Sequence, residues 1–322
     1  MPEIKYYFKT MKPKISRVAK EYGLGAVSNF TEINGGFINE NYKFKTARGI
    51  YIARFIRKNP DEKYLLARKT EFAVLEHLSN KKFKYKTPVP LKNSKGEYLS
   101  IIDGRHVWVY EYIAGTLQKK VDAVEIKESA KALAIYHKVV SKLKTEMKSP
   151  GLTDFGWLRK QFDLLKAKSG NSKLDLLIKK NLGMFEEIIN RLDGTEFSGP
   201  KILIHGDFHN TNMLFEKGKV TAILDFDSVA FSLRCYDVAG AARSFSRTSN
   251  GLDLKKYKTF LDAYQETSKL SKKEISQLIP LMLRGSCYSF NRFAQGDLKD
   301  ERVRYARVAA LIKRTKGIIK LW

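Results

Sequence analysis

The sequence predicts an α+β protein with two lobes, a small lobe built on an antiparallel sheet and a larger lobe that is mainly helical. Short segments rich in aromatic and β-branched residues gather before residue 110. After residue 115, apolar residues recur at the three- and four-residue spacing of helices. The chain has 322 residues, 43% of them hydrophobic, so it can bury two cores. We therefore expect an N-terminal lobe at 1–110, a connector at 111–115 and a C-terminal lobe at 116–322.

In the N-terminal lobe, the apolar pattern predicts a helix over 14–22 that stops at Gly23-Leu24-Gly25. This GxG follows a helix and lacks a third glycine, so helix capping explains it better than nucleotide binding. Three short strands should follow as an antiparallel meander, and a helix and two further strands complete the lobe. The expected strands are 30–34, 41–46, 49–57, 98–102 and 107–113, and the expected helix is 61–79.

The C-terminal lobe reads as a series of helices. In one of them, His137 shares a helical face with apolar residues at three- and four-residue spacing, so we interpret it as a buried histidine with a partner and no catalytic role. Further helices are expected at 158–167, 174–191, 255–267, 273–284 and 302–319. Three short strands, at 201–204, 213–215 and 220–224, interrupt this helical half.

The chain has a formal net charge of +26, from 60 lysines and arginines against 34 acids. Such a charge favours anionic partners, but the basic residues are spread along the chain without a nucleic-acid-binding pattern, so no dedicated nucleic-acid site is expected. No apolar run approaches the length of a membrane span, and no secretory pattern opens the chain, so we expect a cytoplasmic protein without a membrane partner. Cys235 and Cys287 match no metal-ligand spacing and are expected to be reduced.

The most informative stretch is KILIHGDFHNTNMLF, residues 201–215, in which polar residues separate two apolar runs. Asp207 and Asn212 lie five positions apart, and Asp225 follows the next apolar strand. A polar turn explains one or two such residues, but a charge directly after a buried strand is costly. Phosphoryl transfer needs such a set, because it uses a carboxylate to orient a hydroxyl group and oxygen ligands to hold Mg²⁺ on the nucleotide phosphates.

The motifs HGDFHNTN, ILDFD and YDVA together resemble the catalytic core of the protein-kinase-like phosphotransferases, the superfamily of aminoglycoside phosphotransferases, choline kinases and type II homoserine kinases. The segment EYGLGAVSNFTEINGGFINENYKFKTARGIYIARF is most similar to type II homoserine kinases and their close relatives. The resemblance covers nearly the whole chain. It implies a bilobal protein-kinase-like fold, with a nucleotide-binding N-terminal lobe and a catalytic and acceptor-binding C-terminal lobe.

Residue by residue, the resemblance implies that Asp207 is the catalytic base and that Asn212 and Asp225 are Mg²⁺ ligands. It further implies that His205 supports the catalytic loop and that Asp237, in YDVA, holds this loop through backbone hydrogen bonds.

A kinase of this type needs a cation on its third strand and a glutamate on the next helix. The matching positions are Arg54 and Glu71, which we expect to pair, with Lys43 or Lys45 as the alternative cation and a surface lysine as the alternative partner of Glu71. In an extended chain Asp227 would share a face with Asp225, where it either assists metal or acceptor binding or is solvated.

The remaining nucleotide contacts follow from the resemblance. Gly35 and Gly36 would let backbone amides approach the phosphates, although a Gly-Gly hairpin is common without a ligand. Backbone groups of Glu111 and Ile113 in the connector would bind adenine. The chain has no Walker A, GxSxG or HExxH motif, so other phosphate-binding and hydrolytic mechanisms lack support.

These observations predict an ATP- and Mg²⁺-dependent kinase that phosphorylates a hydroxyl group of a small molecule, with an amino acid alcohol such as L-homoserine as the first acceptor. Choline, an amino sugar, a sugar and an aminoglycoside remain alternatives, as does a nucleotide- or nucleic-acid-binding scaffold that keeps the fold without the activity. Candidate acceptor contacts, chosen for polarity or aromatic character, are Asp154, Trp157, Arg234, Tyr288 and Arg292.

Overall fold

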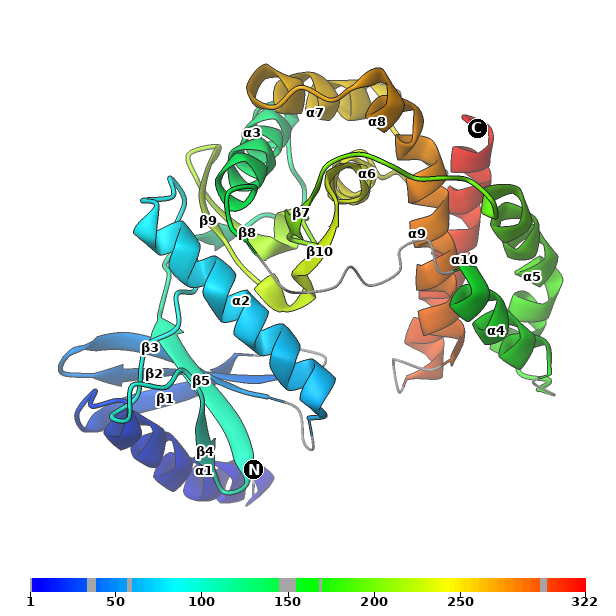
Figure 1. The fold of residues 1–322 in the computed structure, drawn as a ribbon. Helices are drawn as coiled ribbons and strands as arrows, with labels where there is room; N and C mark the ends of the chain where they lie inside the picture. The colour runs from blue at the N-terminus through cyan, green and yellow to red at the C-terminus, as the bar shows by residue number, and fades with distance from the viewer. Residues whose placement is uncertain (1, 34–38, 57–59, 145–154, 168–169, 296–299) are drawn as a thin grey trace. The chain divides into compact units, whose positions relative to one another are not determined.

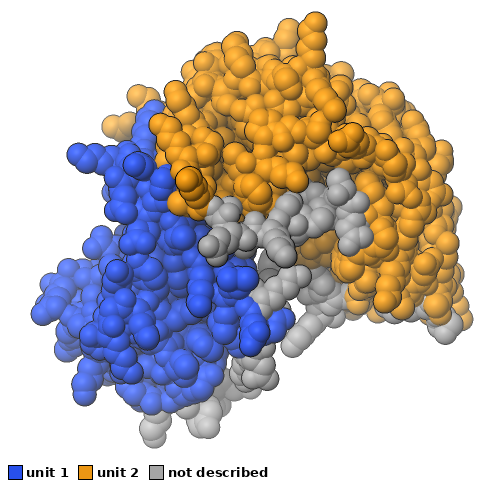
Figure 2. Space-filling view, viewed as in Figure 1, with its two compact units in different colours: residues 1–116, 221–227 blue, residues 117–220, 228–322 orange. Residues whose placement is uncertain are grey.

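The computed structural model describes residues 2–33, 39–56, 60–144, 155–167, 170–295 and 300–322 (Figure 1). The chain divides into two compact units (Figure 2). The first unit is Met1–Thr116 together with Thr221–Asp227, and the second is Leu117–Val220 together with Ser228–Trp322. We expected the chain to divide at one connector, at 111–115. The structure instead groups Thr221–Asp227 with the N-terminal part of the chain. The role of 111–115 as a hinge stays a prediction.

The first unit is built on a five-stranded antiparallel sheet in the order β1-β2-β3-β5-β4, which confirms the α+β fold class and the expected meander. Each strand lies within a few residues of its expected position. The elements of this unit are α1 (Pro2–Glu21), β1 (Val27–Ile33), β2 (Glu40–Thr46), β3 (Gly49–Phe55), α2 (Glu62–Asn80), β4 (Ser100–Ile102) and β5 (Arg105–Glu111). Helix α1 begins earlier than expected and continues through Pro13. It ends before Gly23, whose φ of 64° suits a helix-capping glycine.

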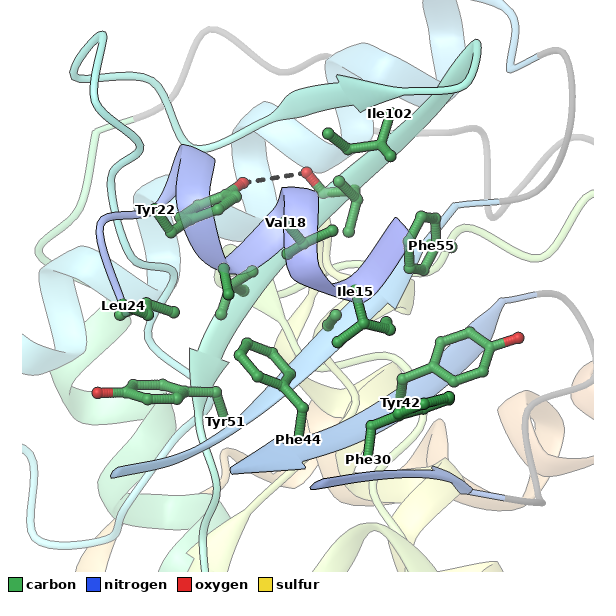
Figure 3. Close-up of a cluster of buried hydrophobic side chains, with 14 of the residues drawn as sticks. Ile15, Val18, Tyr22, Leu24, Phe30, Tyr42, Phe44, Tyr51, Phe55 and Ile102 are labelled. Atoms are coloured by element: carbon green, nitrogen blue, oxygen red, sulfur yellow. Dashed lines mark hydrogen bonds between the residues drawn. The ribbon is translucent and has the colours of Figure 1, made fainter. Parts of the chain in front are cut away.

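One face of this sheet buries its side chains against α1. Ile15 and Val18 of α1 pack against aromatic side chains of the strands, among them Phe44 on β2 (Figure 3). The hydroxyl group of Tyr22 donates to the Val107 carbonyl oxygen at 3.1 Å, so its burial leaves no orphaned donor. Each such apolar side chain removed from water contributes about 1.5–3 kcal/mol, which makes this face the core of the first unit.

The opposite face of the sheet carries Arg54. Successive residues of a strand point to opposite faces, so Ala53 and Phe55 join the α1 core whereas Arg54 does not. Arg54 lies opposite Trp108 in the register of β3 and β5. The Trp108 ring contacts Phe72 of α2 edge-on, with centroids 5.2 Å apart, so Arg54 and α2 share this face.

The second unit is mainly helical. Its helices are α3 (Ala123–Val140), α4 (Phe155–Lys166), α5 (Lys173–Leu192), α6 (Arg234–Phe245), α7 (Leu254–Thr267), α8 (Lys272–Ser276), α9 (Leu278–Gln295) and α10 (Glu301–Ile319). The remaining strands are β6 (Thr116–Leu117), β7 (Lys201–Ile204), β8 (Met213–Glu216), β9 (Lys219–Ile223) and β10 (Ala230–Leu233), and the two 3₁₀ turns are η1 (Asn210–Asn212) and η2 (Phe226–Ser228). Strand β10 pairs antiparallel with β7, and a further small sheet has the order β6-β8-β9.

Two features of the helical part differ from the sequence-based expectation. Strand β10 and helix α6 were not expected, because the helical segment RCYDVAGAARSF is dominated by small residues and has a weak apolar periodicity. The single helix expected at 273–284 is instead α8 followed by α9. Pro280 has no backbone N–H for the carbonyl of Ser276, so the backbone restarts as a new helix with proline in its first turn.

Both cysteines are free, as expected, and the structure shows that both are buried. Burial raises the pKa of the Cys235 thiol to about 11, so this thiol is protonated at neutral pH. None of the helices in the described ranges combines the length and the apolar character needed to cross a bilayer.

Candidate active site

The loop between β7 and β8 presents Asp207, the expected catalytic base. Gly206 enters this loop with φ of 80°, a conformation that side chains other than glycine adopt at a cost. A Cβ atom at this position would also lie 2.3 Å from the backbone oxygen of Ser228. Glycine is therefore required in HGD for two reasons, the backbone conformation and the close approach of a second segment.

The carboxylate of Asp237 on α6 binds the backbone of this loop. Its carboxylate accepts hydrogen bonds from the backbone N–H groups of His205 at 2.8 Å and Gly206 at 3.0 Å. His137 Nε2 donates to the same carboxylate at 2.9 Å, and the other ring nitrogen of His137 bonds the Tyr264 hydroxyl at 2.8 Å. The backbone hydrogen bonds expected of Asp237 are present, and His137 is buried with partners, as expected.

Burial alone would raise the pKa of Asp237, but the hydrogen bond and charge of His137, with further contributions from His205, outweigh it and lower the pKa below its usual value. The carboxylate is therefore ionised at neutral pH, and an ionised carboxylate accepts every hydrogen bond offered to it. His205 is fully buried, and its Nδ1 accepts from the Asp207 backbone N–H at 3.3 Å. This hydrogen bond agrees with the expected support of the loop by His205, which stays a prediction.

The Asp207 carboxylate is held from two sides but remains half exposed, at 49%. His209 Nε2 lies 3.3 Å from one carboxylate oxygen, and Asn212 Nδ2 donates to the other at 3.3 Å and to the Asp207 backbone oxygen at 2.9 Å. Burial acts to raise the pKa of Asp207, but His209, His205 and Asn212 lower it below its usual value. The result is an oriented, ionised and accessible carboxylate.

In the first unit, Arg54 bridges two aspartates that follow β9. Its Nη2 donates to Asp225 Oδ1 at 3.1 Å and to Asp227 Oδ2 at 2.6 Å, and its side chain is only 11% exposed. Burial acts to lower the pKa of Arg54, but the charges of Asp227, Asp225 and Glu71 raise it overall, so the guanidinium stays charged. The structure therefore joins Arg54 and Asp225, which are 171 residues apart in the sequence.

The expected pairing of Arg54 with Glu71 is wrong. Arg68 Nη1 donates to Glu71 Oε2 at 2.5 Å and also binds Asp227, whose backbone oxygen accepts from Arg68 Nη2 at 2.6 Å. Arg68 lies three residues before Glu71 on α2, so the helix itself brings the two side chains together. Arg54 is occupied by Asp225 and Asp227 instead. The three-residue spacing of Arg68 and Glu71 on the expected helix is the sequence pattern that could have predicted this pair.

Glu71 is fully buried. Burial and the negative charge of Asp227 raise its pKa, whereas Arg68 and Arg54 oppose this shift. The cluster formed by Arg54, Arg68, Glu71, Asp225 and Asp227, which we call the α2 charge cluster, contains three carboxylates for two guanidinium groups.

The backbone at Asp225 is not extended. Asp225 has φ of 59°, and Asp227 lies in the 3₁₀ turn η2, so a shared face in an extended strand does not bring them together. Their carboxylates meet because both bind the same guanidinium group of Arg54. Asn39 Nδ2 also donates to Asp227 Oδ2 at 2.8 Å, which ties Asp227 further into the α2 charge cluster and makes it part of the protein network, not a solvated carboxylate.

The structure describes some of the other expected nucleotide contacts but not all of them. Gly35 and Gly36 lie outside the described residues. Glu111 is the last residue of β5, opposite Tyr51, and Ile113 follows the end of the strand. Of the alternative cations, Lys45 is exposed and Lys43 lies over the Tyr112 ring, 3.6 Å from its centroid.

The oxygen donors expected to hold Mg²⁺ suit this ion chemically. Asp225 is 41% exposed on its side chain, and Asn212 donates through its amide nitrogen, which leaves the amide oxygen as the available donor. Mg²⁺ is usually bound by one or two protein oxygens together with substrate phosphates, not by a complete protein cage. Within the described ranges, no group of three His, Cys, Asp or Glu side chains has the geometry of such a cage. Asn212 belongs to the second unit and Asp225 to the first, so a metal ion shared between them stays a prediction.

Of the acceptor candidates, three lie together in the second unit. The Trp157 and Tyr288 rings have centroids 6.0 Å apart, and the Arg292 guanidinium lies 5.9 Å from the Tyr288 centroid. Arg234 instead makes a bidentate ion pair with Glu274, at 2.8 and 2.9 Å from one nitrogen, which gives it a structural role. Asp154 lies outside the described residues.

An antiparallel sheet that carries a buried arginine against two aspartates, together with an HGDxxxxN loop held by a buried aspartate, places the protein among the kinase-like phosphotransferases, enzymes with an alcohol group as acceptor. The chain belongs to the phosphotransferase enzyme family, which its residues 29–270 match.

Among similar proteins of known function are two homoserine kinases. That of Sinorhizobium medicae is 25% identical over 292 residues, which cover 88% of this chain and 84% of the relative. That of Agrobacterium fabrum is 28% identical over 276 residues, which cover 84% and 80%.

Solved structures of similar fold include an amicoumacin kinase in complex with AMP-PNP and Ca²⁺, with a TM-score of 0.70 at 14% identity and coverage of 100% and 99% of the two chains. A microcompartment-associated aminopropanol kinase also has a TM-score of 0.70 at 14% identity, with coverage of 95% and 98%. These likenesses confirm the kinase-like fold.

Proposed function

We propose that the protein transfers the γ-phosphoryl group of ATP to a hydroxyl group of an amino acid alcohol such as L-homoserine. The observation that carries this proposal is the state of Asp207, an ionised and accessible carboxylate held in one orientation by His209 and Asn212. A carboxylate in this state accepts a hydrogen bond from an acceptor hydroxyl group and aligns it for attack.

Asp207 would orient the hydroxyl oxygen and take its proton late in the reaction. A loose phosphoryl-transfer transition state depends more on positioning and charge neutralisation than on a strong base. A carboxylate with a lowered pKa is a weak base but stays ionised, which suits this task. Asp237 and His205 keep the loop backbone in place and do not contact the acceptor.

Asn212 and Asp225 are the proposed ligands of Mg²⁺, which when bound neutralises charge on the nucleotide phosphates. Arg54 orients Asp225 through its hydrogen bond. When the nucleotide binds, Arg54 can donate to a phosphate oxygen in place of Asp225, since a guanidinium group binds carboxylate and phosphate in the same way. Gly35 and Gly36 remain the proposed phosphate loop, and the backbone groups of Glu111 and Ile113 the proposed adenine contacts. ATP is the proposed nucleotide; the similar folds were solved with AMP-PNP in one case and GDP in another.

The choice of acceptor is supported by the homoserine kinases, which align with more than 80% of this chain. Structures of similar fold act on other acceptors, including spectinomycin and an aminopropanol, so amino sugars and other amino alcohols belong in the same test.

The test is ADP release from Mg-ATP across L-homoserine, choline, hexosamines and aminoglycosides, with the wild type, Asp207→Asn and Asp262→Asn. Asp262 is an exposed residue of α7 and controls for loss of one negative charge. We expect turnover that depends on L-homoserine, falls at least a hundredfold in Asp207→Asn and is unchanged in Asp262→Asn. Equal turnover of Asp207→Asn and the wild type would refute the role of Asp207. Turnover with another acceptor alone would refute the choice of homoserine.

A further inference from the structure

A cavity of about 460 Å³ in the second unit is lined by four arginines. Its lining residues belong to α6, to the turn after α6, to α9 and to α10. Helix α9 packs against both α6 and α10 (Figure 1). Its arginines are Arg243 on α6, Arg247 in the turn, and Arg307 and Arg314 on α10. The uncharged polar side chains that line it are Ser244, Ser286 and Ser289.

The wall of this cavity is set by backbone packing. Residues 246–253 form a tight turn, in which Thr248 N donates to Gly251 O at 3.0 Å. Gly251 and Gly317 touch, and a Cβ atom on Gly317 would lie 1.8 Å from the Asn250 carbonyl oxygen. The turn that carries Arg247 is thus pressed directly against the backbone of α10, which carries Arg314.

Three arginines elsewhere in the described chain, by comparison, have acidic partners. Arg54, Arg68 and Arg234 each bind carboxylates. Arg243, by contrast, donates only to neutral groups, the Met282 carbonyl and the Ser286 hydroxyl, at 3.5 and 3.2 Å. No Asp or Glu of the described ranges lines the cavity or pairs with Arg243, Arg247 or Arg314.

Like charges that share a partly enclosed space repel one another at the reduced dielectric of a protein. Burial lowers the pKa of Arg314, and the charges of Arg247 and Arg243 lower it further. The buried Arg314 Nε has no hydrogen-bond partner. An oxyanion would supply acceptors and relieve the repulsion, because guanidinium groups bind carboxylate and phosphate with two parallel hydrogen bonds.

One wall of the cavity is provided by α6, the helix that lies against the proposed catalytic loop. Burial lowers the pKa of Arg243, and the charge of Arg247 adds to this shift, whereas Tyr236 and Asp207 oppose it. The Phe208 ring, next to Asp207, contacts the Phe245 ring, two residues after Arg243, with centroids 6.3 Å apart. The helix that provides this wall of the cavity therefore contacts the loop that presents Asp207.

We propose that this cavity binds an oxyanion group of the acceptor, a carboxylate or a phosphate, so that the acceptor is an anionic or zwitterionic hydroxyl compound and not a cation such as choline or an aminoglycoside. The inference rests on the proposed kinase function. It narrows the alternative acceptors, because a described lining that includes Arg243, Arg247 and Arg314 and contains no Asp or Glu repels a purely cationic acceptor.

The proposed binding of an oxyanion group is tested with pairs of acceptors, in which one member carries the oxyanion and the other lacks it. L-homoserine is compared with its amide, and glycerol 3-phosphate with glycerol, in the wild type, in Arg247→Gln/Arg314→Gln and in Lys313→Gln. Lys313 is the exposed neighbour of Arg314 on α10 and lies outside the cavity lining, so it controls for loss of charge. We expect kcat/KM for one acceptor that carries the oxyanion to exceed that of its partner without the oxyanion at least tenfold. The double variant should lose this preference through KM, and Lys313→Gln should stay within about twofold of the wild type. The preferred pair identifies carboxylate or phosphate.

A binding measurement separates the failure of this inference from that of the kinase function. Calorimetric titration with malonate and with inorganic phosphate, in a buffer without oxyanions, should show binding that weakens at least tenfold in the double variant but not in Lys313→Gln. Equal anion affinity in all three proteins, with kinase activity intact, would overturn the cavity assignment alone. Anion binding lost in the double variant, with no acceptor phosphorylated by the wild type, would overturn the kinase function and with it the acceptor role of the cavity. Turnover of the acceptors without an oxyanion as fast as those that carry one would overturn the acceptor role while the kinase function stands.

Discussion

The carboxylate of Asp237 accepts a hydrogen bond of 2.8 Å from the backbone N–H of His205, so a side chain on α6 fixes the backbone at the start of the loop that presents Asp207. The same carboxylate also accepts from the Gly206 N–H and from His137. Three donors therefore depend on one buried carboxylate, and the loop geometry depends on α6.

Removal of this carboxylate should destabilise the protein. In Asp237→Ala, two backbone N–H groups and the His137 ring lose their acceptor, and we expect the free energy of unfolding to fall by about 3 kcal/mol or more. Asp237→Asn keeps one acceptor oxygen and should cost less. Urea unfolding of the wild type and both variants measures this order. Equal stability of Asp237→Ala and the wild type would contradict the bracing role.

The contribution of Asp237 should depend on pH in a defined direction. The pKa of Asp237 in the folded protein is below the usual value, because His137 and other donors outweigh burial. Its ionised form therefore stabilises the fold above pH about 4, the ordinary range of an unfolded aspartate, and this contribution is lost as the pH falls through the lowered folded-state pKa. We expect the stability gap between the wild type and Asp237→Asn to narrow between pH 6 and pH 2. A gap that widens toward acid would show the opposite sign.

Gly206→Ala should damage activity more than its small size suggests. The new Cβ would meet the Ser228 backbone oxygen and require a positive φ, so the loop must move, with a loss of about 1–3 kcal/mol in stability. A shift of the loop by about 1 Å can cost roughly a hundredfold in turnover. Gly240→Ala on α6 is the matched control, since its Cβ meets no atom within 4 Å. It should be neutral or stabilise the helix by up to about 1 kcal/mol. Comparable losses in both variants would argue against a special conformation at Gly206.

Arg68 and Glu71 should behave as a coupled pair. Arg68→Met leaves the fully buried Glu71 without its hydrogen-bonded partner; the pKa of Glu71, already raised, rises further, so its carboxyl group is protonated and we expect a cost of about 1–3 kcal/mol of unfolding free energy. In Arg68→Met/Glu71→Gln the side chain at 71 cannot ionise, and the double variant should lose less than the sum of the two single variants, which a double-mutant cycle measures. The exposed pair Arg159 and Asp193 is the control, because its disruption should cost less than about 1 kcal/mol. Additive effects of Arg68→Met and Glu71→Gln would show that the two side chains act independently.

His209→Gln should move the acid limb of the pH–rate profile. Burial acts to raise the pKa of Asp207, and His209 is the foremost group that lowers it. Without His209 the pKa of Asp207 rises, so the fraction of ionised carboxylate, and with it kcat/KM, should begin to fall at a higher pH. Profiles from pH 3 to pH 9 for the wild type, His209→Gln and His77→Gln provide the measurement. His77 lies on α2 in the first unit and controls for histidine loss. An acid limb that stays in place in His209→Gln would remove Asp207 as the titrating group.

Much of the candidate site could be predicted from the sequence, because its residues lie close together along the chain. HGDxxxxN places Asp207 and Asn212 on one loop, and the structure joins them by hydrogen bonds. Strands β2, β3 and β7 could be predicted because a two-residue alternation or a short apolar run bounded by turns has few other solutions. The fold class and the phosphotransferase family follow from these patterns, and the comparisons confirm both.

The partners of charged residues were decided by tertiary structure. The sequence by itself identified Arg54, Glu71 and Asp225 as candidate site residues. It did not predict that Arg54 binds Asp225 and Asp227, or that Arg68 binds Glu71. Any carboxylate of suitable geometry satisfies a guanidinium group, so composition and spacing do not select among partners 171 residues apart. The arginine cavity has the same origin. Arg243, Arg247 and Arg314 carry no spacing rule in the chain, and only the packing of α6, its following turn and α10 brings their charges to one place.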